Sequence, residues 1–87
     1  MYYVYILKSD YDGKLYVGYT SDLRKRLQKH KYGNVAATKQ RRPLKLVFYE
    51  AFNNKKDAMA DERFFKTGYG REVLRNKIRN CIDVEVR

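Results

Sequence analysis

Residues 2–30 read YYVYILKSDYDGKLYVGYTSDLRKRLQKH, and this stretch decides the fold. Residues 2–8 and 14–20 are rich in aromatic and β-branched side chains, which is typical of strands. Turn-forming residues separate the two runs at 9–13, where Gly13 is free to take a positive φ. We therefore predict an antiparallel hairpin in which alternate side chains of each strand point to opposite faces.

A short basic helix is predicted after the hairpin. Ser21 is a suitable N-cap, and Asp22 favours the first turn through the helix dipole. We expect the helix to run to about Lys31 and to end before Gly33. Gly18, inside the second strand, indicates a close approach of another group, because glycine in a strand leaves room above the backbone.

The rest of the chain predicts one more strand and two more helices. Asn53 or Asn54 is expected to cap the first of these helices, and Gly68 to end it after about Thr67. The predicted segments are, in order, a basic loop at 33–43, a strand at 44–52, a helix to about 67, a helix over about 71–80, and a terminal strand or extended tail at 81–87. This order predicts a single α+β domain over 1–87, with a small three-stranded antiparallel sheet flanked by about three helices.

Charge indicates the class of partner. The chain has 87 residues and a formal net charge of +10, from 20 Lys and Arg against 10 Asp and Glu. Such an excess favours a polyanion, and we expect a nucleic acid, although an RNA- or ribosome-associated protein would be equally basic.

The single cysteine and the hydropathy pattern indicate the cellular compartment. Cys81 is the only cysteine, which excludes an internal disulfide and a cysteine-based zinc site within one chain. Met1 leads directly into a strand-like run, so we expect no signal peptide, no membrane span and no membrane partner. The reducing cytoplasm is the expected location.

Two tyrosines, an arginine and a histidine are spaced so that they can meet. Tyr5 and Tyr16 lie on neighbouring strands, while Arg26 and His30 lie one helical turn apart. Arginine suits phosphate oxygens, and histidine is a candidate base or phosphate donor. Ordinary strand aromatics and a solvated basic helix face are the alternatives.

A carboxylate downstream is a candidate metal ligand. Glu62 falls on the same helical arc as Ala58, Met59 and Phe65, where an unpaired charge would be costly. The alternative is a glutamate at the rim that pairs with one of the many cations. Asp61, beside it, is expected to be exposed.

These residues together carry a resemblance to a known family. Val4-Tyr5, then Tyr16-Val17-Gly18 and the helix SDLRKRLQKH, resemble the GIY-YIG nuclease domain. RRPLKLVFYEAF at 41–52 and AMADERFFK at 58–66 resemble the small stand-alone bacterial members of that family, so the likeness covers residues 2 to about 79. The positions of the family's two tyrosines, arginine, histidine and metal-binding glutamate fall on Tyr5, Tyr16, Arg26, His30 and Glu62. The first motif reads Tyr3-Val4-Tyr5, without the family's glycine.

The resemblance implies a metal-dependent endonuclease that hydrolyses phosphodiester bonds in DNA, with DNA repair or recombination as its setting. Glu62 would hold one Mg²⁺ or Mn²⁺, and Arg26 would neutralise the phosphate. Tyr5 or Tyr16, helped by His30, would position or deprotonate the attacking water. Which tyrosine acts as the base stays open at this point.

Eight further cations are predicted to bind the nucleic acid: Arg24, Lys25, Lys29, Lys39, Arg41, Arg42, Lys55 and Lys66. No residue is an obvious reader of base edges, so we expect structure-selective or nonspecific binding, or guidance by a protein partner. Two alternatives remain: a nucleic-acid-binding module on the same scaffold without turnover, and a subunit whose basic face docks on an acidic protein.

Overall fold

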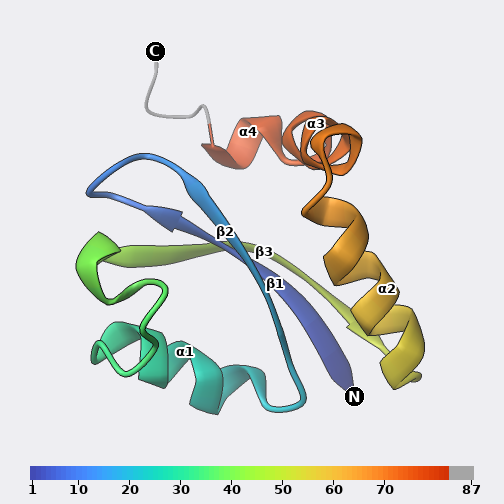
Figure 1. The fold of residues 1–87 in the computed structure, drawn as a ribbon, viewed down its shortest axis with the longest axis horizontal. Coiled ribbons are helices and arrows are strands. Elements are labelled where there is room, and N and C mark those ends of the chain that lie inside the picture. The colour runs from blue at the N-terminus through green and yellow to red at the C-terminus, as the bar shows by residue number, and fades with distance from the viewer. Residues whose placement is uncertain (83–87) are drawn as a thin grey trace.

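The computed structural model describes residues 1–82, so the tail predicted at 81–87 lies mostly outside the described residues. Figure 1 shows its elements along the chain. They are β1 (Tyr2–Ser9), β2 (Leu15–Thr20), α1 (Leu23–Lys31), the 3₁₀ turn η1 (Lys39–Arg41), β3 (Leu44–Phe52), α2 (Lys55–Phe65), α3 (Gly68–Lys77) and α4 (Arg79–Ile82).

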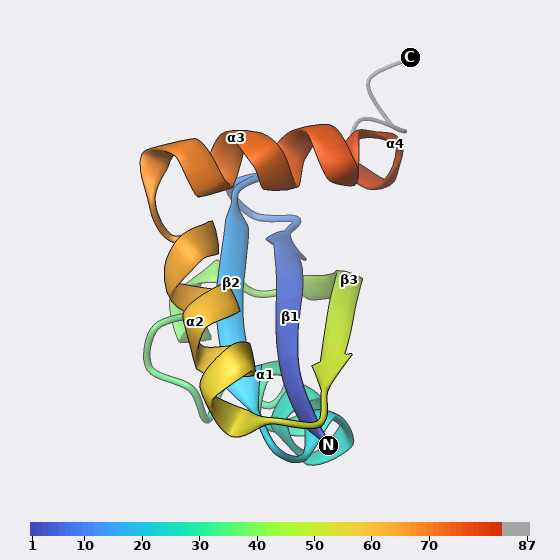
Figure 2. The same ribbon diagram turned by 90° about the vertical axis from the view of Figure 1, so that its right-hand side faces the viewer.

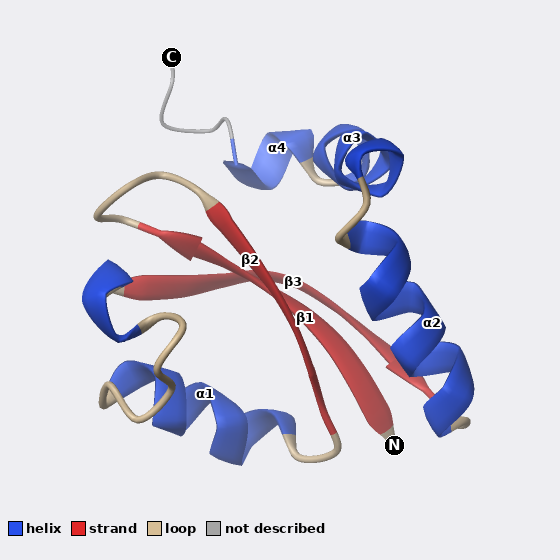
Figure 3. Ribbon diagram, in the orientation of Figure 1, coloured by secondary structure: helices blue, strands red, loops and turns tan. Residues whose placement is uncertain are grey.

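A three-stranded antiparallel sheet forms the centre of the fold. Its strand order is β2-β1-β3, and β1 pairs with β2 as a hairpin. Helix α1 lies on one side of the sheet, and α2, α3 and α4 lie on the other (Figures 1 and 2). The predicted α+β class and sheet are confirmed, with a fourth short helix and a 3₁₀ turn added (Figure 3).

The main apolar core lies between the sheet and α2, α3 and α4. Val4 and Ile6 of β1 are almost completely buried there. They share this face because alternate residues of a strand point the same way. The other buried members of the core are Val17, Ala58, Phe65, Leu74, Ile78 and Ile82.

The opposite face of β1 is buried too, but with polar partners. Tyr5 and Leu7 are 0% and 2% exposed on the side that α1 covers. His30 of α1 and Thr38 of the following loop are also buried. The alternation predicted for β1 therefore produces an apolar core on one face and a partly polar one on the other.

The helix ends differ from prediction in three places. Asp22, rather than Ser21, caps α1: its carboxylate accepts from the Lys25 backbone N–H at 3.1 Å, and an ionised acceptor is stronger than a hydroxyl. Helix α2 ends at Phe65, and Gly68 begins α3 instead of ending α2. Thr67 causes this break, since its hydroxyl caps α3 by accepting from the Gly70 N–H at 2.9 Å.

Residues 33–43, predicted as a loop, are held against the hairpin by Ser9. The buried Ser9 hydroxyl donates to the Arg41 carbonyl at 2.6 Å and accepts from the backbone N–H groups of Tyr11 and Asp12. The Asp10 N–H donates to the Pro43 carbonyl at 2.9 Å. These bonds place the loop, and therefore Thr38, beside α1.

Within residues 1–82, none of the helices combines the length and the apolar composition that crossing a membrane requires.

The tight junction between α2 and α3 gives a test of the fold. A Cβ on the buried Gly70 would overlap the backbone carbonyl of Phe64, whereas a Cβ on Gly68 would meet nothing within 4 Å. We expect Gly70→Ala to lower the free energy of unfolding by about 1–3 kcal/mol. Gly68→Ala, in the same helical turn, should change it by less than about 0.5 kcal/mol. Urea unfolding of both variants measures this, and equal midpoints would contradict the described junction.

Candidate functional site

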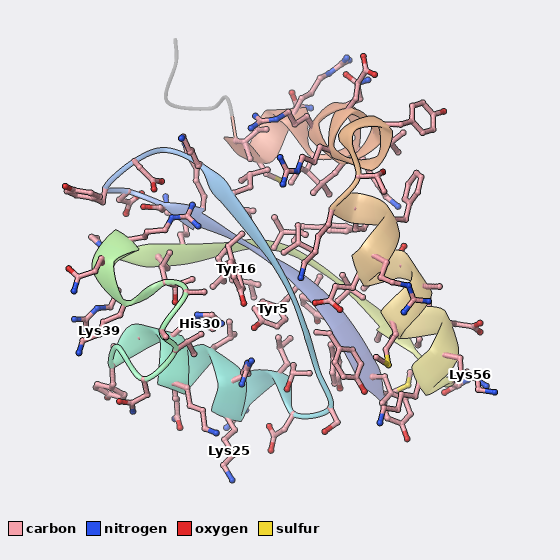
Figure 4. All side chains as sticks on the ribbon, in the orientation of Figure 1. Tyr5, Tyr16, Lys25, His30, Lys39 and Lys56 are labelled. Carbon is pink, nitrogen blue, oxygen red and sulfur yellow. The ribbon has the colours of Figure 1, made fainter. Side chains whose placement is uncertain are left out.

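The hydroxyl of Tyr5 lies at the centre of a cluster of side chains beneath α1. Its oxygen is 2.8 Å from Nε2 of His30, and Nε of Arg26 donates to it at 3.3 Å. The tyrosine comes from β1 and the other two residues from successive turns of α1, which faces this side of the sheet (Figure 4). Three of the five predicted catalytic residues therefore meet at one oxygen atom.

His30 is fixed in place from both sides of its ring. Its Nδ1 is 2.7 Å from the hydroxyl of the buried Thr38, opposite the Nε2 contact with Tyr5. Burial and the nearby charge of Arg26 lower the pKa of His30 to about 4. The ring is therefore neutral at pH 7, with one nitrogen donating and the other accepting. Thr38 was missed by sequence reasoning, because it lies in a segment without periodicity.

Tyr16 completes the aromatic part of the cluster. Its ring centroid is 5.3 Å from that of His30 and 6.4 Å from that of Tyr5. The close approach predicted at Gly18 is confirmed: Gly18 pairs with Tyr5 across the hairpin, and a Cβ there would overlap the Tyr5 ring. Tyr3, which replaces the family's glycine, packs edge-on against Tyr49 and leaves Tyr5 in place.

The electrostatics keep the Tyr5 phenol protonated. Burial is the largest cause and raises its pKa above the usual value, while the hydrogen bond from Arg26 lowers it. The charges of Tyr16 and Glu62 raise the pKa further. No hydrogen bond or ion pair joins Glu62 to Tyr5, Tyr16, Arg26 or His30, and its helix α2 packs on the other face of the sheet.

Glu62 itself is paired with a cation, as the alternative interpretation expected. Nζ of Lys66 lies 3.1 Å from its Oε2, one helical turn away, and the Glu62 side chain is 20% exposed. Residues 1–82 contain no group of three His, Cys, Asp or Glu side chains able to hold a metal. A site built on Glu62 would therefore rest on one carboxylate. Its donor chemistry suits Mg²⁺, which keeps several waters and takes phosphate oxygens as further ligands.

Asp61 is not exposed, contrary to prediction. It is half-buried, and its Oδ2 is shielded from solvent without a hydrogen-bond partner among the described residues. Burial, followed by the neighbouring Glu50 carboxyl group, raises the pKa of Asp61 to about 7. Lys77 pairs with Glu50 at 3.0 Å. This carboxyl pair lies on the side of the sheet away from His30, because Glu50 is opposite Val4 in the sheet register.

The eight predicted nucleic-acid-binding cations do not share one surface. Lys25 points away from Tyr5 and Tyr16 in Figure 4, and Lys39 lies at the end of the sheet beyond His30. Arg41 is already paired with Asp12 at 2.8 Å. The remaining members are exposed on α1 (Arg24, Lys29), after η1 (Arg42), at the start of α2 (Lys55) and just after it (Lys66).

Sequence reasoning missed three cations beside Tyr16. Lys14, Arg71 and Arg75 line a groove next to this tyrosine. Arg71 and Arg75 lie four residues apart on α3, a spacing that puts both on one helix face. That spacing was the available signal, but nothing in the sequence places α3 beside β2.

Comparisons with known proteins match most of this chain to one family. The family model described as the GIY-YIG catalytic domain matches residues 1–78. A UPF0213 protein of Bacillus pumilus is 49% identical over 67 residues, covering 76% of this chain and 67% of that protein. One of Streptococcus agalactiae is 48% identical over 65 residues, covering 74% and 73%. The solution NMR structure of a UPF0213 protein from Bacillus halodurans is similar with a TM-score of 0.54 and 41% identity, covering 85% of this chain and 82% of that one.

Two groups on opposite faces are expected to give opposite pH dependences of stability. The pKa of His30 falls from 6.5 to about 4 on folding, so its contribution is complete above pH 6.5 and is lost as the pH falls toward 4. The pKa of Asp61 rises from 3.8 to about 7, so its contribution is complete below pH 3.8 and is lost as the pH rises through 7.

We therefore expect the two contributions to oppose each other in the unchanged protein. Asp61→Asn should leave a free energy of unfolding that rises by roughly 1 kcal/mol per pH unit between about pH 4.5 and 6.5, since one proton separates the two states. His30→Gln keeps hydrogen-bonding capacity but does not titrate. In this variant the free energy of unfolding should fall as the pH rises over the same range. Urea unfolding across this range measures both slopes, and slopes of the same sign would contradict the assignment.

Proposed function

This chain belongs to the GIY-YIG family, whose members are typically endonucleases, and we propose that it is an endonuclease that hydrolyses phosphodiester bonds in DNA with one divalent metal ion. The observation that carries the proposal is the Tyr5 hydroxyl, held between Nε of Arg26 and Nε2 of His30. Any buried tyrosine needs a hydrogen-bond partner, but the two partners here are a cation that suits phosphate and a neutral imidazole that can accept the phenolic proton.

Arg26 supplies positive charge at the edge of the cluster. Its guanidinium uses Nε toward Tyr5 and has further N–H groups for a second partner. A planar guanidinium suits phosphate oxygens, and preorganised donors stabilise the charge that develops when water attacks the phosphorus. Arg26 is therefore assigned to the phosphate.

Tyr5 is assigned as the residue that takes the proton from the attacking water, and because Tyr5 is 0% exposed this requires neighbouring side chains to move aside when the substrate binds. Its phenol is protonated at neutral pH, so it must give up one proton as it accepts another. The neutral His30 ring, 2.8 Å away, is the acceptor: the water proton goes to the Tyr5 oxygen as the phenolic proton goes to Nε2. Nδ1–H then donates to Thr38. Among residues 1–82, the Tyr16 hydroxyl has no such base behind it, so its role is to line the site.

Glu62 is assigned as the protein ligand of the metal. Lys66 occupies Oε2, and Oε1 makes no hydrogen bond to any described residue. A bound Mg²⁺ or Mn²⁺ would supply charge stabilisation at the phosphate and the leaving oxygen. The negative charge of Glu62 also raises the pKa of Tyr5, which favours keeping the phenolic proton.

The substrate is assigned as DNA, with branched or distorted forms of repair or recombination as the expected targets. The chain carries a net charge of +10, which attracts any nucleic acid without regard to sequence. A protein partner would be a second source of target choice. Under this proposal, the DNA cleavage takes place in the cytoplasm.

Loss of the metal ligand tests the enzyme assignment. Glu62→Gln should reduce nicking of a branched DNA by at least about 100-fold in Mg²⁺ or Mn²⁺, because one carboxylate holds the ion. Asp61→Asn, at the neighbouring position, should cut at the rate of the unchanged protein. If Glu62→Gln cuts normally, the assignment is wrong. If the unchanged protein binds DNA in a salt-dependent way but never cuts it with either metal, the chain is a binding module.

The choice between the two tyrosines is tested by removing each hydroxyl. Tyr5→Phe should lower the single-turnover rate by about 10²–10⁴-fold, the usual worth of a general base. Tyr16→Phe should lower it by less than about tenfold, since its ring packing is kept. Single-turnover cleavage with a labelled branched substrate measures both, and the reverse order would move the base to Tyr16.

A further inference from the structure

A basic groove opens beside the Tyr5 cluster, between the hairpin and α3. Its volume is about 730 Å³, and Tyr16 is one of the residues that line it. Lys14 borders it from the hairpin, Lys66 from the end of α2, and two arginines from α3. We call it the α3 groove; its charged lining residues are Lys14, Arg41, Lys66, Arg71, Arg75 and Asp12.

Two of its five cations are already neutralised within the protein. Arg41 pairs with Asp12 at 2.8 Å, and Lys66 pairs with Glu62 at 3.1 Å. The side chains of the other three, Lys14, Arg71 and Arg75, form no hydrogen bond or ion pair with any of residues 1–82. Three like charges around one hollow repel each other, and this repulsion is relieved by an anion that reaches all of them.

The shape of the anion follows from the spacing of the arginines. Arg71 and Arg75 are four residues apart in α3, which places them one turn, about 6 Å, apart along the helix axis. Successive phosphates of a nucleic acid strand repeat at a comparable distance. A row of phosphates can therefore meet both guanidinium groups, each of which matches phosphate geometry.

The groove is continuous with the cluster through Tyr16. This residue lines the groove and also packs against His30, with ring centroids 5.3 Å apart. On the other side of the cluster, a small hollow includes Arg26, Lys25 and Lys29 of α1. Helices α1 and α3 lie on opposite sides of the labelled tyrosines in Figure 4. A strand in the groove would therefore reach the cluster with one end.

We propose that the α3 groove binds the sugar-phosphate backbone of one nucleic acid strand on one side of the phosphate that is cut, with Arg71 and Arg75 contacting phosphates in sequence and Lys14 facing them from the hairpin. The position of the groove relative to the cut phosphate rests on the proposed function. The claim that the groove binds a nucleic acid strand rests only on the residues that line it.

The test is DNA binding without catalysis. Fluorescence anisotropy with a labelled 20-nucleotide single strand and its duplex, in EDTA, compares the full chain with Arg71→Gln/Arg75→Gln across a range of salt. We expect the double variant to bind at least tenfold more weakly at low salt, and its log–log salt slope to be smaller by about 1.5–2, because two phosphate contacts are lost. Lys45→Gln/Lys56→Gln removes the same charge from two exposed lysines outside the groove lining. It should change affinity less than threefold and leave the slope unchanged.

The possible outcomes distinguish a failure of the groove assignment from a failure of the enzyme assignment. If both double variants weaken binding equally, only net charge matters and the groove assignment is overturned. If Arg71→Gln/Arg75→Gln binds as the unchanged protein while Glu62-dependent cutting persists, the groove is overturned and the enzyme stands. If the variant loses affinity and salt slope but the unchanged protein never cuts, the groove stands and the enzyme falls.

Discussion

A buried chain of hydrogen bonds, from Thr38 through His30 and Tyr5 to Arg26, is the constraint on which the rest of this structure depends. Tyr5, His30 and Thr38 are at most 1% exposed, so any of their polar groups left unpaired would cost about 1–3 kcal/mol. The partners come from β1, α1 and the loop after α1. These three segments must therefore keep their relative positions for the face under α1 to remain folded. The side chains that hold this face together are therefore the same ones that form the candidate site.

The central strand β1 makes this arrangement possible in so short a chain. Its even-numbered residues, Val4 and Ile6, belong to the apolar core beneath α2 and α3, and its odd-numbered Tyr5 belongs to the cluster beneath α1. An 87-residue chain has little surface to bury, and here one strand is used on both of its sides. The apolar side supplies stability, which allows the other side to keep polar groups that an apolar core would exclude.

Local patterns predicted the elements, and long-range packing decided the details. The period of two in residues 2–8 and 14–20 predicted the hairpin, and the spacing of Arg26 and His30 predicted that both face one side of α1. Thr38 could not be predicted, because the tether from Ser9 that positions its loop joins residues 32 positions apart. Asp61 was misjudged for the same kind of reason: it is half-buried beside Glu50 of β3, and only the packing of α2 on the sheet brings these two carboxyl groups together. The α3 groove likewise depends on where α3 packs. The periodicity of a helix predicts which residues share a face, but not which element the helix packs against.

The tether between Ser9 and the Arg41 carbonyl has a consequence for how such chains can vary in length. Hairpin tips are usually the places where a fold tolerates extra residues. Here the tip is closed by bonds from the Ser9 N–H to the Lys14 carbonyl and from the Gly13 N–H to the Ser9 carbonyl, while the Ser9 side chain holds η1. An insertion at the tip would shift the hydroxyl that anchors the loop bearing Thr38, and so would disturb the ring of His30. The tip is thus an unsuitable point for grafting a new domain onto this scaffold, although it lies at the surface.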